Sequence, residues 1–155
     1  MKRRSYYLAY GSNLNIRQMQ IRCPMAIPVV GAVLKDYELL FRGGNGSAVA
    51  TIEPKAGSSV PCVLWLITPE DEEALDCYEG FPHHYRKEMV PVQFGSRKMN
   101  VMAYIMNAGH SLAMPGKDYL YTILHGYKTF RLDFSALYEA LDIAANASAP
   151  YKPPE

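Results

Sequence analysis

Residues 6–14 constrain the fold of this chain more than any other segment. They read Tyr-Tyr-Leu-Ala-Tyr-Gly-Ser-Asn-Leu and indicate a short strand that breaks sharply at Gly-Ser-Asn and passes into a helix beginning near Asn15. Glycine adopts dihedrals closed to other residues, and asparagine tolerates them better than most. Such a turn can direct successive N–H groups at one ligand oxygen. The simpler interpretation is a strand-ending turn in which Asn13 or Asn15 caps the helix.

A second informative segment is the helix expected between Thr68 and Gly80. Thr68 is a fitting N-cap, and Pro69 stands in the first turn, where proline is tolerated. The acids at 70–73 suit the positive end of the helix dipole, and they need be no more than solvated surface. Gly80, followed by Phe-Pro, ends the helix.

Glu79 is the candidate for proton transfer in this helix. Ala74, Leu75 and Tyr78 share its inward face, and Glu79 follows Leu75 by one helical turn. An apolar flank and a helix C-terminus both disfavour a negative carboxylate, so we expect a raised pKa for Glu79. A carboxyl group of that kind can transfer protons near neutral pH. Alternatively, Glu79 extends into solvent or pairs with Arg86.

Several further short segments carry information through their order and spacing. The segments, in chain order, are 8–14, 48–52, 60–65, 75–80, Tyr85, 103–106 and 114–119. Together they resemble the γ-glutamylcyclotransferase family over residues 6–142. Relatives that act on γ-glutamylamines tend to carry Thr-Leu-Lys after Tyr-Gly, whereas this chain has Ser-Asn-Leu. This chain has Gly116 where the family often has a serine shortly before the tyrosine. The resemblance therefore leaves open how the loop before Tyr119 covers the site.

The resemblance implies an α+β fold, a small mixed and mostly antiparallel β-barrel flanked by helices, with the pocket at its mouth near Gly11. It implies an enzyme of acyltransferase or lyase type that cyclises a γ-glutamyl amide and releases 5-oxoproline with an amine or amino acid. Glu79 would be the general acid and base, with no cofactor and no metal. The substrate-binding residues would be Tyr7, Leu8, Ala9, Tyr10, Gly11, Ser12, Tyr85 and Tyr119.

The substrate of this reaction carries its own nucleophile, the α-amine, so proximity provides much of the rate. N–H groups near Gly11 and Ser12 would hold either the α-carboxylate or the developing oxyanion. Two alternatives remain open. The chain could process a γ-glutamylamine or a γ-glutamyl-protected intermediate with the same Glu79, or it could be a non-catalytic binding module. Formation of 5-oxoproline distinguishes an enzyme from a binder.

Composition sets the remaining limits. The 155 residues, 49% of them hydrophobic, fit one domain over 1–146 with a proline-rich tail over 147–155. Sixteen basic and fifteen acidic residues give a formal charge of +1, which offers no electrostatic case for nucleic acid or an anionic membrane. No secretion signal or spanning stretch is evident. Three widely spaced cysteines indicate free thiols, with Cys77 packed as a small apolar residue. We expect a cytoplasmic monomer or homodimer that binds a small molecule.

Two other site types find little support. Four histidines lack the spacing of a zinc site, because no His-Glu-x-x-His or Cys-x-x-Cys pattern occurs. Ser12 lacks the Gly-x-Ser-x-Gly pattern of a serine hydrolase.

Elsewhere, apolar patterning and turn residues predict strands and two C-terminal helices. The expected strands are 27–34, 37–42, 48–53, 60–68, 85–94 and 98–106, and the helices are 118–130 and 134–145.

Overall fold

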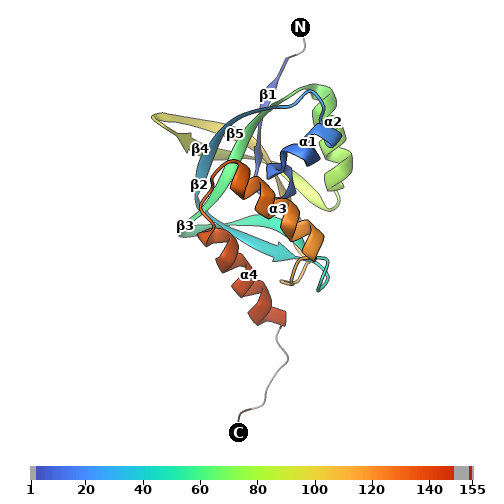
Figure 1. Cartoon of the computed structure of the whole chain (residues 1–155), viewed down its shortest axis with the longest axis vertical. Coiled ribbons are helices and arrows are strands. Elements are labelled where there is room, and N and C mark those ends of the chain that lie inside the picture. The colour runs from blue at the N-terminus through green and yellow to red at the C-terminus, as the bar shows by residue number, and fades with distance from the viewer. Residues whose placement is uncertain (1–2, 149–153, 155) are drawn as a thin grey trace.

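Within the part of the chain that the structure describes, residues 3–148 and 154, five strands close into a barrel flanked by four α-helices (Figure 1). The structure is a computed structural model. Neighbouring strands are antiparallel except β1 and β5, which run parallel and meet at Tyr7 and Met102. The predicted mixed, mostly antiparallel α+β barrel is therefore confirmed. The strands are β1 (Ser5–Ala9), β2 (Ile27–Arg42), β3 (Val49–Ile67), β4 (Tyr85–Phe94) and β5 (Arg97–Met106), and the order round the barrel is β1-β3-β2-β4-β5.

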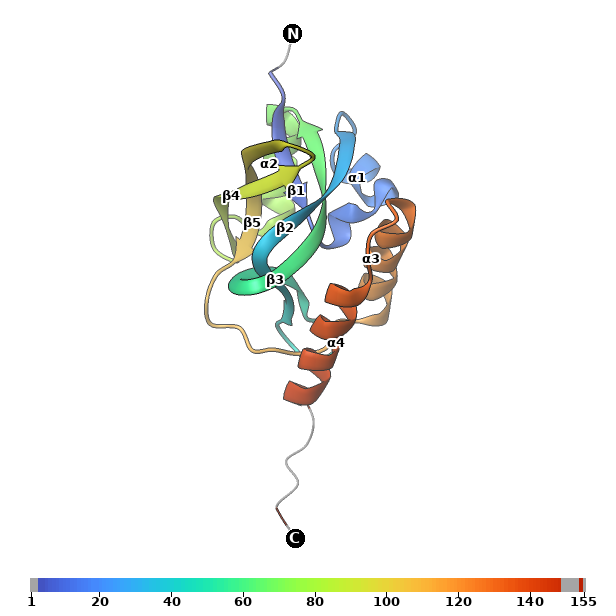
Figure 2. The same cartoon turned by 90° about the vertical axis from the view of Figure 1, so that its left-hand side faces the viewer.

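The helices are α1 (Ile16–Arg22), α2 (Pro69–Glu79), α3 (Lys117–Thr129) and α4 (Ser135–Ser148), with a short 3-10 turn η1 over Ser12–Leu14. Figure 2 shows α1, α3 and α4 along one side of the barrel. No helix among the described residues is long and apolar enough to cross a membrane. The helix α4 extends through residues 147 and 148 into the segment expected to be a tail. Residues 149–153 and 155 of that segment lie outside the described residues.

The strands β2 and β3 correct the prediction of four short strands. Each runs unbroken, and the two pair on both sides of an irregularity between Lys35 and Tyr37. There the residues opposite Asp36 loop out of register, and the Gly57 N–H donates to the Asp36 carboxylate at 3.0 Å. Glycine and proline at 54–59 predicted a break. The ladder resumes beyond them, so these residues mark a bulge within a long bent ribbon.

Reciprocal capping fixes the start of α2. The Asp71 N–H donates to the Thr68 hydroxyl, and the Thr68 N–H donates to the Asp71 carboxylate at 3.0 Å. Asp71 is buried, so the expectation that all the acids at 70–73 are solvated surface is wrong for this residue. The helix ends as predicted at Gly80, which adopts the left-handed conformation with φ 65°. Both ends of α2 are thus fixed, and Glu79 is its last residue.

The strand-to-helix turn is held from two sides. Asn15 caps α1 by accepting a hydrogen bond from the Gln18 N–H, which settles the choice between Asn13 and Asn15. The Asn15 side chain also donates to the Thr122 carbonyl of α3 at 3.1 Å. Further along α3, a Cβ added at Gly126 would lie 2.5 Å from the Leu14 Cβ. Glycine therefore lets α3 pack directly against η1.

This contact predicts the sign of a substitution. Helix propensity alone predicts that Gly126→Ala stabilises the protein by up to about 1 kcal/mol. The contact with Leu14 predicts destabilisation instead, on the order of 1–3 kcal/mol, because α3 and η1 must separate to admit a methyl group. Chemical denaturation measures the free energy of unfolding. The exposed Lys128→Ala on the same helix is the control and should change it little. A stabilised Gly126→Ala variant would contradict the packing described.

Candidate active site

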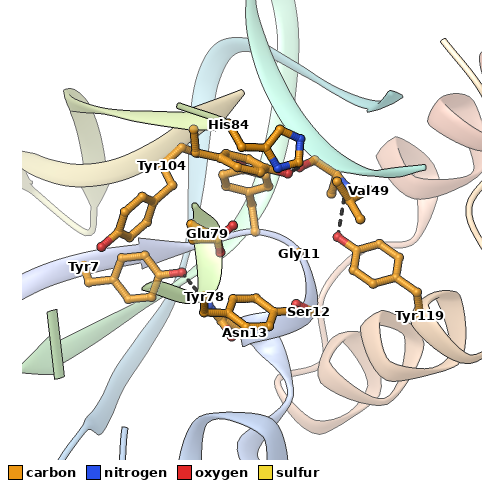
Figure 3. Close-up of a pocket in the computed structure, with 13 residues that line it drawn as sticks. Tyr7, Gly11, Ser12, Asn13, Val49, Tyr78, Glu79, His84, Tyr104 and Tyr119 are labelled. Atoms are coloured by element: carbon orange, nitrogen blue, oxygen red, sulfur yellow. Dashed lines mark hydrogen bonds between the residues drawn. The ribbon is translucent and has the colours of Figure 1, made fainter. Parts of the chain in front are cut away.

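A cavity of about 180 Å³ opens at the end of the barrel where β1 passes into η1 (Figure 3). Its wall combines the strand end and turn, the C-terminal end of α2, the start of β3 and β4, and α3. Among the lining residues, tyrosine is the commonest type. The lining residues are Tyr7, Tyr10, Gly11, Ser12, Asn13, Val49, Ala50, Tyr78, Glu79, His84, Tyr85, Tyr104 and Tyr119.

Glu79 lies at the centre of the labelled residues in Figure 3. Its carboxyl group makes no hydrogen bond or ion pair with any residue in the described chain, and Arg86, the alternative partner considered from sequence, pairs with Glu88 instead. Burial raises the pKa of Glu79 to about 7, and the positive charge of Arg22 lowers it in part. The increase in the pKa of Glu79 that was predicted from the sequence has the same direction. A carboxyl group of this pKa is half ionised near neutral pH and can both accept and return a proton.

A chain of side-chain hydrogen bonds joins the turn to the first wall of the cavity. The Asn13 amide donates to the Tyr7 hydroxyl at 2.9 Å, and the Asn13 carbonyl oxygen accepts from Arg22. Arg22 also donates to the Ser12 hydroxyl at 3.2 Å. Because the Tyr7 oxygen already accepts a hydrogen bond, its own proton remains free to donate into the cavity.

The backbone of Ala50 in β3 holds two further tyrosines. Its N–H donates to the Tyr119 hydroxyl at 2.9 Å, and its carbonyl accepts from the Tyr85 hydroxyl at 2.6 Å. These bonds leave the two phenols with opposite capacities. Tyr119 can still donate its proton, whereas Tyr85 has committed its proton and can only accept. Tyr10 resembles Tyr85, because its hydroxyl donates to the Tyr104 carbonyl at 2.6 Å.

The cavity therefore offers two kinds of polar group. The donors are the hydroxyls of Tyr7 and Tyr119, and the N–H groups at Gly11 and Ser12, where the chain enters η1 and the first N–H groups have no partner within the turn. The acceptors are Glu79, Tyr10 and Tyr85. Burial raises the pKa of all four tyrosines well above their ordinary value, so the phenols stay neutral. A ligand with an amine on one side and carbonyl or carboxylate oxygens on the other matches this arrangement.

The sequence-predicted residues divide into two groups. Tyr7, Tyr10, Gly11, Ser12, Glu79, Tyr85 and Tyr119 all line the cavity. Leu8 and Ala9 are buried in the barrel core and are not among the lining residues. Tyr78 lines the cavity mouth with 46% of its surface exposed, and Cys77 is exposed too. The prediction that Cys77 packs as a small apolar residue was wrong, and the inward face assigned to Tyr78 is the open mouth of the cavity, where the Arg22 guanidinium group stacks on its ring.

Sequence reasoning missed several residues that build the site. Asn13 was considered only as a helix cap, and Ala50 acts through its backbone, which leaves no mark in the sequence. His84 lies in the cavity wall with its ring 5.1 Å from that of His110. Burial and the neighbouring His110 lower the pKa of His84. Arg22 carried no signal of its own, because one arginine at a helix end usually faces solvent.

A close contact between two backbone segments explains why glycine stands at position 116, where the family pattern has serine. The loop before α3 runs beside residues 43–48, where the Gly46 N–H donates to the Met114 carbonyl at 2.8 Å. A Cβ at position 116 would lie 2.9 Å from the Gly46 carbonyl oxygen. Glycine thus permits a close backbone crossing just before α3, and this crossing fixes the origin of the helix that carries Tyr119.

The comparisons with known proteins agree with this geometry. The model of the family described as γ-glutamyl cyclotransferase, AIG2-like, matches residues 7–129, which contain every lining residue of the cavity. The chain belongs to this family. A metal centre has no support in the described residues, since no group of three or more His, Cys, Asp or Glu side chains could hold an ion there.

The individual relatives share about a quarter to a third of their residues with this chain over the matched parts. A bovine γ-glutamylcyclotransferase is 33% identical over 81 residues, which are 48% of this chain and 43% of the relative. The match thus spans less than half the length of that curated relative. A solved γ-glutamyl cyclotransferase structure superposes with a TM-score of 0.80 at 25% identity, covering 89% of this chain and 86% of the other. The structure of an uncharacterized human protein superposes with a TM-score of 0.78 at 27% identity, covering 98% of this chain and 94% of the human protein.

Gly11 provides a test of the turn. Its φ is −119°, outside the left-handed region, so the reason for glycine is close approach: a Cβ would lie 3.2 Å from the Ala50 Cβ and 3.4 Å from the Tyr119 hydroxyl. Gly11→Ala should raise KM about tenfold or more while lowering Tm by only a few degrees, since the added methyl group occupies the cavity wall. Ser12→Ala is the matched control and should have the milder effect, because the main-chain N–H survives. Normal KM in Gly11→Ala with lost activity in Ser12→Ala would contradict this account and point to the hydroxyl.

Proposed function

We propose that this chain is a γ-glutamylcyclotransferase-type enzyme that cyclises a γ-glutamyl amide without hydrolysis. The products are 5-oxoproline and the amine or amino acid that formed the amide. Glu79 carries this proposal, because its half-buried carboxyl group, surrounded by tyrosines and unpaired among the described residues, has a pKa of about 7 and faces a cavity of amino-acid size. Membership of the γ-glutamyl cyclotransferase family supports the same reaction class.

The reaction transfers two protons from the α-ammonium nitrogen to the leaving nitrogen, which departs as an amine and becomes an ammonium group. The Glu79 carboxylate accepts a proton from the α-ammonium group, and the free amine attacks the γ-carbonyl carbon to form the ring C–N bond. The tetrahedral oxyanion is stabilised by hydrogen-bond donors of the cavity, the N–H groups at Gly11 and Ser12 and the Tyr119 hydroxyl. Glu79 then protonates the leaving nitrogen, the original amide C–N bond breaks, and the carboxylate accepts the second proton from the new ring nitrogen and passes it to the released amine. No water or cofactor is consumed, and the carboxyl group returns to its starting state.

The size and polarity of the cavity favour one orientation of the substrate. A volume of about 180 Å³ is below the roughly 300–1,000 Å³ of pockets that enclose drug-sized ligands. It suits a single γ-glutamyl group, whose α-amine meets Glu79, Tyr10 and Tyr85 and whose oxygens meet the donors. The leaving group then lies at the mouth near His84 and Tyr78. The leaving-group pocket is therefore shallow, and γ-glutamylamines stay a candidate substrate class alongside γ-glutamyl amino acids.

Product analysis tests the proposal. Purified protein is incubated separately with γ-glutamyl-alanine and γ-glutamyl-lysine, and 5-oxoproline, free glutamate and the released amino acid are quantified by mass spectrometry. We expect equimolar 5-oxoproline and amino acid from at least one substrate, with no glutamate. Glutamate as the product would indicate a hydrolase, and the absence of any product from either substrate would favour the binding module.

Replacement of the carboxyl group by an amide tests its role. Glu79→Gln should lower kcat by at least about a hundredfold, the scale for loss of a general acid–base. It should not lower Tm at pH 8. The folded protein keeps the Glu79 proton up to a higher pH than the unfolded chain does, so the ionised carboxylate destabilises the fold there and Gln removes that cost. Wild-type turnover in a folded Glu79→Gln variant would contradict the mechanism.

The pH dependence of kcat/KM tests the ionisation state. The reaction requires Glu79 as carboxylate, so activity should fall as pH decreases, with a half-maximal point near pH 7, the pKa to which burial raises this group from its ordinary value of 4.5. Of the other lining residues, His84 is the one whose side-chain type ordinarily titrates near neutral pH, so His84→Gln is the control and should leave the midpoint in place. A midpoint near 4.5, or one that His84→Gln abolishes, would contradict the assignment of the base to Glu79.

A further inference from the structure

Arg22 connects three parts of the site without lining the cavity. It is the last residue of α1, and its side chain is partly buried behind the turn. One guanidinium nitrogen donates to the Ser12 hydroxyl at 3.2 Å and to the Asn13 carbonyl oxygen. The guanidinium carbon lies 3.3 Å above the centre of the Tyr78 ring, next to Glu79 in α2. The same side chain thus contacts the oxygen-binding turn and the helix end that carries the proposed base.

These contacts fit arginine and no other residue type. A planar guanidinium group stacks on an aromatic face while its N–H groups donate in the plane, and a lysine ammonium cannot do both. Tyr78 is held by this stacking although it is nearly half exposed. The Asn13 oxygen accepts from Arg22, and this fixes the Asn13 amide so that it donates to Tyr7. Arg22 therefore orients the turn, the Tyr7 hydroxyl and the C-terminal end of α2 together.

The charge of Arg22 is also unshared. None of the ion pairs among the described residues includes Arg22, and the acids of α2 on the other side, Glu72 and Asp76, pair with Lys87. The neutral titratable groups around Glu79 are Tyr7 and Tyr10 from β1 and the turn, Tyr78 from α2, His84 and Tyr85 at the start of β4, Tyr104 from β5 and Tyr119 from α3. Arg22 is the charged side chain in the described chain that acts on the Glu79 carboxyl group.

We infer that Arg22 is a positioning residue for the proposed reaction, which holds the oxygen-binding turn against the end of α2 and places a positive charge beside the helix end that carries Glu79. This inference rests on the proposed function for its kinetic consequences, but the structural coupling of Arg22 to Glu79 stands apart from turnover. Burial without a cation would hold the base protonated to a higher pH. Arg22 offsets part of that effect and keeps the carboxylate available near neutral pH.

Three variants separate charge, geometry and simple helix stability. Arg22→Met keeps the length of the side chain but removes its charge and hydrogen bonds. Arg22→Lys keeps the charge and loses the planar contacts. Arg17→Met removes an exposed arginine from the same helix and is the matched control. Thermal melting establishes that each variant is folded. The values of kcat and KM for γ-glutamyl-alanine are then measured from about pH 5 to about pH 9, a range that brackets the expected titration of Glu79.

Arg22→Met should move the acid-side midpoint of kcat/KM upward by roughly half to one pH unit, the low end of the effect of an opposite charge because Arg22 is partly solvated. Arg22→Lys should move this midpoint less. At pH values above the midpoint, Glu79 is ionised in all the proteins and only the geometry of the turn differs, so there both Arg22 variants should have a higher KM than the wild type. Arg17→Met should match the wild type. An unshifted midpoint in a folded Arg22→Met variant would overturn the inference, whatever its kcat.

A titration that does not depend on turnover distinguishes failure of the inference from failure of the proposed function. In free protein labelled with ¹³C at glutamate side chains, the Glu79 carboxyl signal, assigned by its loss in Glu79→Gln, is followed against pH. The inference predicts a higher midpoint in Arg22→Met than in the wild type, even if no substrate is turned over. Equal midpoints in the two proteins overturn it, even if both release 5-oxoproline.

Discussion

The partial burial of one carboxyl group among neutral side chains determines how this site can work. Glu79 ends a helix at the cavity, and within the described chain no side chain or N–H group pairs with it. Neutral phenols surround it, and they cannot compensate a full negative charge as a cation or several donors would. Proton affinity therefore rises to the range in which one group can accept and return a proton. The capping of α2 at Thr68 and Gly80 serves this end, because it fixes where the last helical residue lies.

The tyrosines give the cavity its direction. Their hydroxyls are divided by the hydrogen bonds they already make, so that Tyr7 and Tyr119 remain donors while Tyr10 and Tyr85 remain acceptors. A γ-glutamyl group has its amine and its oxygens at separate positions and can satisfy both sides at once. Ala50 sets two of these four hydroxyls through its backbone alone. The packing of α3 on η1 at Gly126 brings Tyr119 and the turn into the same wall.

The parts predictable from sequence were those with a local physical cause. Thr68, Gly80 and Asn15 mark helix ends by capping chemistry, and the raised pKa of Glu79 follows from its position on an amphipathic helix. The resemblance to the γ-glutamylcyclotransferase family provided the barrel and the tyrosines at 7, 10, 85 and 119. The domain limits of 1–146, the oligomeric state and the cytoplasmic location stay predictions.

The parts that sequence did not yield depend on contacts between distant segments. The stacking of Arg22 on Tyr78 joins two helices that only the closed barrel brings together. Residues 54–59 have the composition of a connection, yet pairing with β2 on both sides keeps them within one strand. Tyr78 has the spacing of a core residue, yet 46% of its surface stays exposed because it lines the open cavity, although the Arg22 side chain stacks on its ring. Local patterns carry no information on which surface another element will cover.

The most direct test of the account is a crystal structure of the Glu79→Gln variant with γ-glutamyl-alanine bound. We predict that the γ-glutamyl group fills the cavity with its α-amino nitrogen within hydrogen-bond distance of the side chain at position 79. The γ-carbonyl oxygen should face the N–H groups at Gly11 and Ser12, with the alanine at the mouth. A γ-glutamyl group bound in the reverse orientation, with its amine directed to solvent and away from position 79, would contradict it.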